Sequence, residues 1–439
     1  MKARDRYVFY KNRPEWADVT PIPQDDNGRN VVKIAYSPQF VDAHDYMRAV
    51  LLKDERSERA LEITATVLLL NPANYTVWEY RRRILTSLQS DLNDEVTFVS
   101  KLIDENSKNY QLWHHRQWVV IQLANKAGDS LTSEDDKQAT LSELSLNELQ
   151  FTADVISDDA KNYHAWQHRR WAVGFFKVPV TVELGFTESL IREDMYNNSA
   201  WNHRFVTVTN DEGLTPNVLQ REVDFVQNII RSAPANESSW NYLYGLLVPT
   251  PCVVAASGSH RPPAPRSTQL SSARPDLASF NTSVNVVDEV AGDEVPPNSN
   301  LTRLVTLPVP AANLRMMRTF AEELAASDTV ASTSVALHAF LVEVYTDCLQ
   351  AKTSKLLSSE AVSNSDEVCN ETKPVDQLYP NMPENIVAKD SDESITNLVD
   401  LAVSTCERLA TELDRIRAGY WRYRSRQLQA IGVEHLPSS

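Results

Sequence analysis

The sequence contains little glycine and little cysteine, and both shortages limit the possible folds. Only 10 of the 439 residues are glycine, and β-branched residues alternating with turn pairs such as Asn-Gly are nearly absent. This composition argues against a protein of many short strands, whose hairpin turns favour such pairs. The four cysteines lack the spacing of a metal site or of a disulfide framework and stand at Cys252, Cys348, Cys369 and Cys406. We therefore expect an almost wholly helical protein in a reducing, cytoplasmic compartment.

Long apolar runs and an excess of positive charge are also missing. The chain has no run of 18 apolar residues and begins without the apolar core of a secretory signal, so we expect neither a membrane span nor secretion. The formal net charge of −16 disfavours a nucleic-acid partner, which requires a basic surface. The histidine motifs lack the acid that accompanies two histidines in a zinc-binding helix, so no metal ligand is predicted in this chain.

One short motif recurs five times along the chain. It consists of an Asn, a Trp four residues later and, in four copies, an Arg three residues beyond the Trp. The copies are spaced by 35, 53, 35 and 39 residues, and their tryptophans are Trp78, Trp113, Trp166, Trp201 and Trp240. The wide gap holds residues 125–148, rich in Ser, Asp and Glu, which we interpret as a local insertion. Without it the period is about 35 residues, which is typical of stacked helix pairs.

The residues around each motif favour helices. Before the second motif, Val96, Val99 and Ile103 follow a helical spacing, and strict alternation is absent. Asn109 is a predicted N-cap because its side chain can accept a hydrogen bond from a free backbone N–H. A single hairpin cannot bury its own apolar face, so neighbouring hairpins must stack. We predict an all-α solenoid of helical hairpin repeats.

Composition divides the chain outside the motifs. Residues 13–26 contain three prolines and no periodicity, which suggests an extended arm. Two segments rich in Pro and Ser or in Ser, Asn, Asp and Glu bury too little apolar surface to fold. One long last helix is predicted over 395–428. The predicted organisation is an N-terminal extended arm at 1–36, helical repeats at 37–250, a disordered Pro/Ser-rich insertion at 251–310, C-terminal helical repeats at 311–428 with a disordered loop at 358–393, and a tail at 429–439.

The repeated Trp and Arg are interpreted first as structural residues. A Trp at one position of five units is expected to fill the seam between neighbouring hairpins, where it buries a large apolar area. The Arg lies on nearly the same face and is expected to bridge to a carboxylate or a backbone carbonyl of the next unit. These arginines are Arg81, Arg116, Arg169 and Arg204, and the fifth unit has Leu243 instead.

Lys161 has a less certain role when only the residues are considered. It stands just before a predicted helix start, where the helix N-terminus and an ammonium group together would suit an anion. Lys108 has the same register in the second unit, so a solvated surface lysine remains the default interpretation. The histidines, among them His164, are equally ambiguous. The residues alone therefore predict a helical-repeat scaffold that binds partners.

The repeats resemble those of protein prenyltransferase alpha subunits. The stretches "DAKNYHAWQHR", "NYTVW", "WHHR", "NNSAWNHRF" and "NESSWNYL" are similar to the repeat signatures of that family. Outside the repeats, "WADVTPIPQ", "DYMRAVLLKDERSERAL" and "YWRYRSRQL" resemble the subunit that farnesyltransferase shares with type I geranylgeranyltransferase. The resemblance implies a crescent-shaped, right-handed α–α superhelix that wraps around a beta subunit. It also implies transfer of a farnesyl or geranylgeranyl group from its diphosphate to the Cys of C-terminal C-a-a-X proteins such as small GTPases.

The resemblance also implies roles for single residues. Zn²⁺ would be bound by the beta subunit, and Mg²⁺ would accompany the isoprenoid diphosphate. Lys161 matches the lysine that approaches the diphosphate and becomes the predicted catalytic residue, whereas Lys108 stays a surface residue. Tyr163, His164 and Asn197 become predicted substrate-binding residues. Arg169 and Trp201 are predicted to support the loop that carries Lys161.

Two alternatives remain at this stage. The Rab geranylgeranyltransferase alpha subunit shares such repeats, but the "WADVTPIPQ" arm argues against it. A non-catalytic helical-repeat scaffold would use the same stacked hairpins without any reaction.

Overall fold

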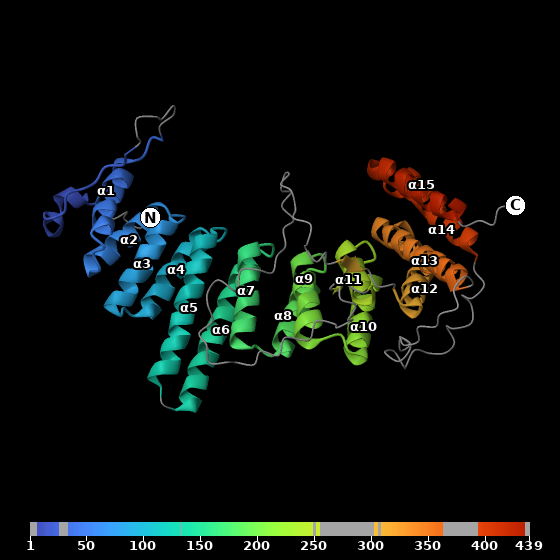
Figure 1. The fold of residues 1–439 in the computed structure, drawn as a ribbon, viewed down its shortest axis with the longest axis horizontal. Coiled ribbons are helices and arrows are strands. Elements are labelled where there is room, and N and C mark those ends of the chain that lie inside the picture. Colours follow the sequence, from blue (N-terminus) through green and yellow to red (C-terminus); the bar gives the residue numbers. More distant parts are fainter. Residues whose placement is uncertain are drawn as a thin grey trace. The chain divides into compact units, whose positions relative to one another are not determined.

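A computed structural model of the chain describes residues 7–25, 34–131, 133–248, 252–254, 303–305, 309–362 and 394–434. The chain forms two compact units, Met1–Gly213 and Leu214–Ser439. Both units consist of helices that pack against their neighbours in chain order (Figure 1). The prediction of an all-α fold of helical hairpin repeats is confirmed.

Among its described residues, the first unit contains nine α-helices and a closing π-helical turn, η3 (Thr207–Glu212). Four hairpins follow the first helix, and each pairs an even-numbered helix with the next odd-numbered one. The helices are α1 (Pro38–Leu52), α2 (Glu58–Leu70), α3 (Tyr75–Leu88), α4 (Leu92–Glu105), α5 (Tyr110–Ser130), α6 (Glu134–Asp158), α7 (Tyr163–Phe176), α8 (Val180–Glu193) and α9 (Asn198–Val206).

Each motif helix starts at the Asn of the repeated motif. The Asn side chain accepts a hydrogen bond from a backbone N–H of the first helical turn, which would otherwise lack a partner. The predicted cap at Asn109 is confirmed, since its Oδ1 lies 3.0 Å from Gln111 N. The same contact fixes the start of α3, α5, α7, α9 and α11 through Asn74, Asn109, Asn162, Asn197 and Asn236.

The five motif tryptophans are core residues, as predicted. Their exposed fractions lie between 0% and 9%. Every indole N–H also donates to the backbone carbonyl six residues earlier, in the turn that precedes its own helix. The acceptors are the oxygens of Pro72, Ser107, Ala160, Met195 and Pro234, at distances of 2.7–2.9 Å. A Trp therefore fills the seam and fastens the preceding turn.

The interpreted insertion at 125–148 lengthens α5 and α6, the adjacent helices of two neighbouring hairpins. It continues α5 to Ser130 and forms the first part of α6, so these helices have 21 and 25 residues, compared with 14 in α3 and α4. Figure 1 shows α5 and α6 reaching beyond their neighbours at one end of the unit. The Ser133 side chain caps α6 by accepting a hydrogen bond from the backbone N of Asp136. The first turn of α6 contains Glu134, Asp135 and Asp136, whose negative charges interact favourably with the helix dipole.

The N-terminal arm is less extended than predicted. Two short 3₁₀ turns, η1 (Tyr10–Asn12) and η2 (Pro14–Trp16), interrupt it. The Asp42 carboxylate accepts from the backbone N of Tyr10 at 2.7 Å, and the Tyr10 hydroxyl donates to Thr66 at 2.8 Å. Trp16 is 1% exposed and packs edge-on against Tyr10. These contacts fold the arm back onto α1 and α2.

In its described part, the second unit contains six α-helices and a short two-stranded ladder. In the ladder, β1 (Cys252–Val254) pairs antiparallel with β2 (Arg303–Val305), and both strands fall within the segment predicted to be disordered. The rest of 251–308 lies outside the described residues. The helices are α10 (Pro216–Ser232), α11 (Glu237–Leu247), α12 (Ala311–Ser327), α13 (Val335–Val362), α14 (Ile395–Arg408) and α15 (Ala418–Glu434).

Three predicted boundaries in this unit were wrong. The single last helix over 395–428 is a pair, because the backbone leaves the helix at Asp414 (φ −136°, ψ 61°). Asp414 then accepts from Trp421 Nε1 at 2.8 Å, and α14 packs against α15. Ile416, two residues after the break, is 99% exposed. In addition, α13 continues to Val362 and α15 to Glu434, into the predicted loop and tail. Residues 363–393 lie outside the described part.

No helix among the described residues has the length and apolar character needed to cross a membrane.

Candidate functional site

The turn between α6 and α7 carries the predicted catalytic lysine. Asp159 Oδ1 accepts from the backbone N of Lys161 at 3.1 Å, and the Trp166 indole holds the Ala160 carbonyl at 2.9 Å. Asn162 Oδ1 then accepts from the backbone N of His164 at 3.0 Å. The backbone on both sides of Lys161 is thus fixed, while its side chain is exposed.

This turn is fastened to the equivalent turn of the preceding hairpin. Asn162 Nδ2 donates to the Ser107 carbonyl at 3.2 Å, and the same oxygen accepts from the Trp113 indole at 2.7 Å. Lys108 Nζ, on the preceding turn, lies 3.1 Å from Asp159 Oδ2. Two turns that are 53 residues apart in the sequence therefore lie side by side and share hydrogen bonds.

The structure separates the two lysines that share a register. Lys108 is ion-paired with Asp159, whereas no carboxylate in the described part of the chain lies within ion-pair distance of Lys161 Nζ. The ammonium group of Lys161 is consequently available to an external anion, and that of Lys108 is engaged.

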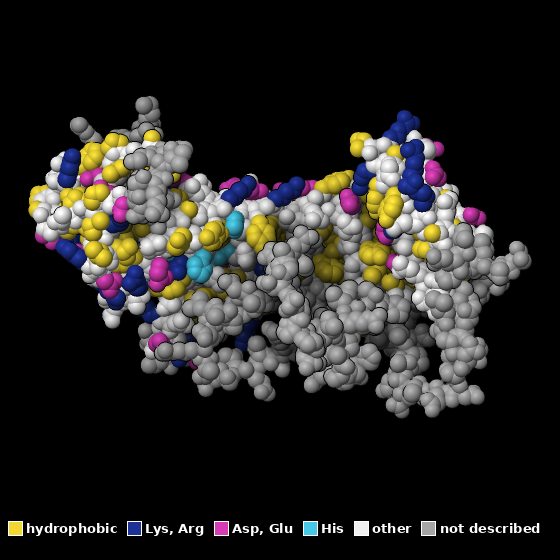
Figure 2. Space-filling view, turned by 45° about the horizontal axis from the view of Figure 1, so that its top comes forward, with side chains coloured by type: hydrophobic (Ala, Val, Ile, Leu, Met, Phe, Trp, Pro, Cys, Tyr) yellow, Lys and Arg dark blue, Asp and Glu magenta, His cyan; other side chains and the backbone are white. Residues whose placement is uncertain are grey.

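Tyr163 and His164 follow Lys161 at the start of α7. The Tyr163 side chain is 65% exposed, and its ring meets the His164 ring edge-on with centroids 5.8 Å apart. Figure 2 shows histidine side chains at the surface beside hydrophobic ones over the middle of the first unit. Tyr75 and Tyr110 hold the same helix position and are 69% and 63% exposed. The structure thus brings three of the predicted site residues together at one exposed helix start.

Two other predicted residues, Asn197 and Trp201, belong to the interior. Asn197 is 3% exposed and caps α9 by accepting from Ala200 N at 3.2 Å. Trp201 is 1% exposed, and its indole holds the Met195 carbonyl. Neither contact involves the Lys161 turn. Trp166, which was not among the predicted site residues, contacts this turn directly through its bond to the Ala160 carbonyl.

Arg169 joins two hairpins. Its guanidinium makes two hydrogen bonds to Glu183 on α8, at 2.9 and 2.7 Å, and donates to the Leu149 carbonyl on α6 at 2.9 Å. The ring of Phe186 lies 3.5 Å from the guanidinium carbon. The predicted bracing by arginine is therefore confirmed here, with a carboxylate of the next hairpin as partner.

The same arrangement recurs at each seam of the first unit, and we call it the seam triad. A triad consists of the motif Arg of one hairpin, a buried Glu on the first helix of the next hairpin, and a His two residues after that hairpin's Trp. The Glu accepts two bonds from the Arg and one from His Nε2. The triads are Arg81–Glu95–His115, Arg116–Glu148–His168 and Arg169–Glu183–His203.

The Arg204 guanidinium also donates to a carbonyl, that of Leu184, at 3.1 Å. In the fifth copy Tyr242 replaces the histidine, and its hydroxyl donates to Glu222 at 2.7 Å. The sequence carried a signal for these partners. Each triad Glu, and Glu222 as well, stands 18 residues before the Trp of its own hairpin.

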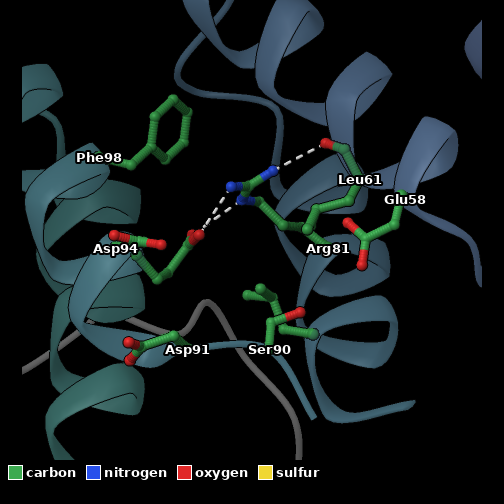
Figure 3. Close-up of a pocket in the computed structure, with 9 residues that line it drawn as sticks. Glu58, Leu61, Arg81, Ser90, Asp91, Asp94 and Phe98 are labelled. Atoms are coloured by element: carbon green, nitrogen blue, oxygen red, sulfur yellow. Dashed lines mark hydrogen bonds and ion pairs between the residues drawn. The ribbon is translucent and has the colours of Figure 1, made fainter. Parts of the chain in front are cut away.

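A pocket of about 430 Å³ opens beside the first triad, between α2, α3 and α4. Figure 3 shows Arg81 in its wall, with a bond to the Leu61 carbonyl, and the carboxylates of Glu58, Asp91 and Asp94 around it. None of the predicted site residues lines this pocket. In the described residues, no three His, Cys, Asp or Glu side chains converge as metal ligands.

The first two triads keep their carboxylates ionised and their histidines neutral. Burial raises the pKa of Glu95, but the hydrogen bonds from His115 and Arg81 outweigh it and lower the pKa to about 2. Burial lowers the pKa of His115 to about 4, against the opposing effect of Glu95. Arg82 Nε donates to His115 Nδ1 at 3.3 Å, so the proton of the neutral ring belongs on Nε2 and points to Glu95. The pKa values of Glu148 and His168 shift in the same directions.

These shifts predict a loss of stability in mild acid. The folded pKa of His115 lies below the unfolded value, so the unfolded chain binds more protons as the pH falls from about 6.5 to about 4. The loss is on the order of 3 kcal/mol for this histidine. Below that range, the carboxylate contribution of Glu95 declines as the pH falls from about 4.5 toward 2. Thermal unfolding followed by circular dichroism should show a melting temperature that falls steadily from pH 7 to pH 4.

The control for this prediction is His115→Gln, which keeps an N–H donor toward Glu95 but cannot titrate. It should be less stable at pH 7 and show a shallower dependence on pH. A pH dependence as steep as that of the wild type would exclude His115 as its source.

Comparison with known proteins was consistent with this geometry. Protein prenyltransferase alpha subunit repeats match residues 57–88, 92–123, 145–176, 181–211 and 219–248. In order, these ranges overlap the pairs α2–α3, α4–α5, α6–α7, α8–α9 and α10–α11, and they leave out the end of α5 and the start of α6.

The chain is also similar to curated relatives and to a solved structure. It is 50% identical over 101 residues to the protein farnesyltransferase/geranylgeranyltransferase type-1 subunit alpha of Solanum lycopersicum, covering 23% of this chain and 29% of that protein. It is 50% identical over 103 residues to the subunit of the same name from Pisum sativum, covering 24% and 31%. The matched segment thus spans less than a third of each relative.

A chain of Candida albicans protein geranylgeranyltransferase-I complexed with GGPP has the same fold, with a TM-score of 0.60 at 20% identity over 97% of this chain and 99% of that chain. Five repeat matches, buried motif tryptophans and this shared fold agree. Five helix pairs of the chain are therefore similar to protein prenyltransferase alpha subunit repeats, and the chain shares the fold of that solved structure.

Proposed function

We propose that this chain is the alpha subunit of a heterodimeric protein prenyltransferase. The enzyme would transfer farnesyl or geranylgeranyl from its diphosphate to the Cys of C-terminal C-a-a-X proteins such as small GTPases. The observation that carries the proposal is the exposed, unpaired Lys161 ammonium on a turn that four hydrogen bonds hold in place. The names of the relatives and of the solved complex with GGPP support the same substrates.

Lys161 would stabilise the leaving diphosphate. Negative charge grows on that group as the bond to the isoprenoid carbon breaks, and a cation already in position lowers the barrier without reorganising. Tyr163 and His164 stand next to Lys161 on the same helix start and would contact the substrates. For Asn197 we propose an indirect contribution, because its amide caps α9. Arg169 and Trp201 would keep the α7–α9 region rigid.

The metals would come from outside this chain. Following the resemblance of the repeats, we assign Zn²⁺ to the beta subunit, where it would keep the substrate thiol as a thiolate. Mg²⁺ would enter with the diphosphate. We place the enzyme in the cytoplasm.

Coexpression with a farnesyltransferase or type I geranylgeranyltransferase beta subunit tests the proposal. The two chains should copurify as a 1:1 complex and transfer radiolabel from farnesyl or geranylgeranyl diphosphate to a C-a-a-X peptide. The chain alone, and a peptide with Ser in place of the acceptor Cys, should give no labelled product. Labelling only of a Rab protein would favour the Rab enzyme, and a complex without any transfer would leave a scaffold.

A further inference from the structure

Asp159 lies between two lysines and contacts both. Its Oδ1 accepts from the backbone N of Lys161, and its Oδ2 lies 3.1 Å from Lys108 Nζ. The bond from the Lys161 backbone and the Lys108 ammonium lower the pKa of Asp159, so the carboxylate is charged at neutral pH. A full negative charge therefore stands two residues before Lys161.

We propose that Lys108 is a positioning residue, which neutralises Asp159 and so keeps the Lys161 ammonium free for an anionic ligand. The inference rests on the proposed function for the identity of that ligand, a diphosphate. It gives a role to Lys108, which the sequence alone presents as an ordinary surface lysine.

One carboxylate oxygen, Asp159 Oδ2, has two possible partners, the ammonium groups of Lys108 and Lys161. Without Lys108, Asp159 Oδ2 has no partner, while Oδ1 still holds the Lys161 backbone. The four-carbon stem of Lys161 is flexible and ends in a compact charge, so Nζ can turn back to the free oxygen. An ammonium paired in this way carries less net charge toward an incoming phosphate.

The contribution of Lys108 to stability should be small. Its side chain is 76% exposed, and exposed ion pairs add little to the free energy of unfolding. A loss of activity in a Lys108 variant therefore reports the charge near Lys161, provided that the fold is intact. The Asp159 backbone contact must also survive, which an Asn at this position allows because its side-chain oxygen is still an acceptor.

Four variants of the complex with the beta subunit test this inference. Lys108→Ala should lower kcat by about 3- to 10-fold, on the scale of weakening one charge-stabilising contact, with little change in the KM of the peptide. Asp159→Asn should stay within twofold of the wild type. The double variant Lys108→Ala/Asp159→Asn should recover to the level of Asp159→Asn. Lys101→Ala, which removes an exposed lysine from the same hairpin, is the matched control and should be unchanged.

Recovery in the double variant is the decisive result, because a purely structural role for the pair predicts equal or greater loss when both residues change. A double variant as slow as Lys108→Ala, or a Lys108→Ala enzyme as fast as wild type, would overturn the inference.

A second measurement does not depend on activity. In the full-length chain, trace acetylation by acetic anhydride, read by mass spectrometry, reports how strongly each ammonium is paired. Acetylation of Lys161 should slow two- to fivefold in Lys108→Ala and return in the double variant. An unchanged rate would contradict the pairing. The acetylation rate of Lys161 could change while the complexes of all variants, including Lys161→Ala, turn over equally. That result would support the pairing and refute the catalytic role of Lys161.

Discussion

Replacing Lys161 with alanine should lower turnover of the complex by about 10- to 1000-fold, on the scale of losing one group that stabilises charge in the transition state. The reason is that its ammonium lacks an ion-pair partner in the described part of the chain and stands on a fixed turn. Single-turnover transfer of label to a C-a-a-X peptide measures the effect. Copurification with the beta subunit should be unaffected, because the side chain is exposed.

Lys161→Arg and Lys177→Ala complete this experiment. Arginine keeps the positive charge but spreads it over a planar group, so partial activity is expected. Lys177 begins the turn after α7 and lies at the opposite end of that helix, so its removal should leave turnover unchanged. Wild-type turnover by Lys161→Ala would remove this residue from the mechanism and leave only the assembly part of the proposal.

The motif tryptophans and the asparagine caps could be predicted because each is a local feature. An N-cap depends on the three residues that follow it, and a Trp repeated at one helix position has a single economical use, in the seam. The role of Trp166 in holding Ala160 was not predicted. The bond spans six residues backward across a turn, and only the five-fold repetition of that spacing would have revealed it.

The triad glutamates were missed for a different reason. The chain has 59 acidic residues, and any of them is a formal partner for an arginine. The distance from Arg to Glu also changes from 14 residues for Arg81 to 32 for Arg116, because the lengthened parts of α5 and α6 lie between the two partners of the second triad. Measured from the Trp instead, the spacing is constant. The sequence therefore contains a constant Glu-to-Trp spacing, but counting from the Arg does not reveal it.

The pair α14 and α15 shows what periodicity alone cannot decide. Apolar residues continue at helical spacing through the break, yet the side chain of Ile416 points to solvent. A hydrophobic stripe does not distinguish one long helix from two helices that pack on each other, since both bury the same residues on either side of the break. The contact between Asp414 and Trp421, seven residues apart, closes the turn.

Replacing Glu148 with alanine should cost about 3–5 kcal/mol of stability, the usual penalty for breaking a buried ion pair. Glu148 is 2% exposed and accepts from Arg116 at 2.9 and 2.6 Å and from His168 at 2.7 Å. Its removal leaves the Arg116 guanidinium buried in the seam without a counter-charge. The guanidinium cannot reach water unless the stacked hairpins separate. For a unit of this size, the melting temperature should fall by about 10 °C.

The cause of that loss can be separated from the loss of packing volume. Glu143→Ala, at an exposed position of the same helix, should stay within about 0.5 kcal/mol of the wild type. The double variant Arg116→Leu/Glu148→Leu removes both charges and fills the seam with apolar groups, so it should be more stable than Glu148→Ala. Chemical denaturation of all three measures the differences. The buried charge of Arg116 explains the loss only if the double variant is more stable than Glu148→Ala. If the double variant proves less stable, the hydrogen bonds of the triad, and not the pairing of that charge, stabilise the seam.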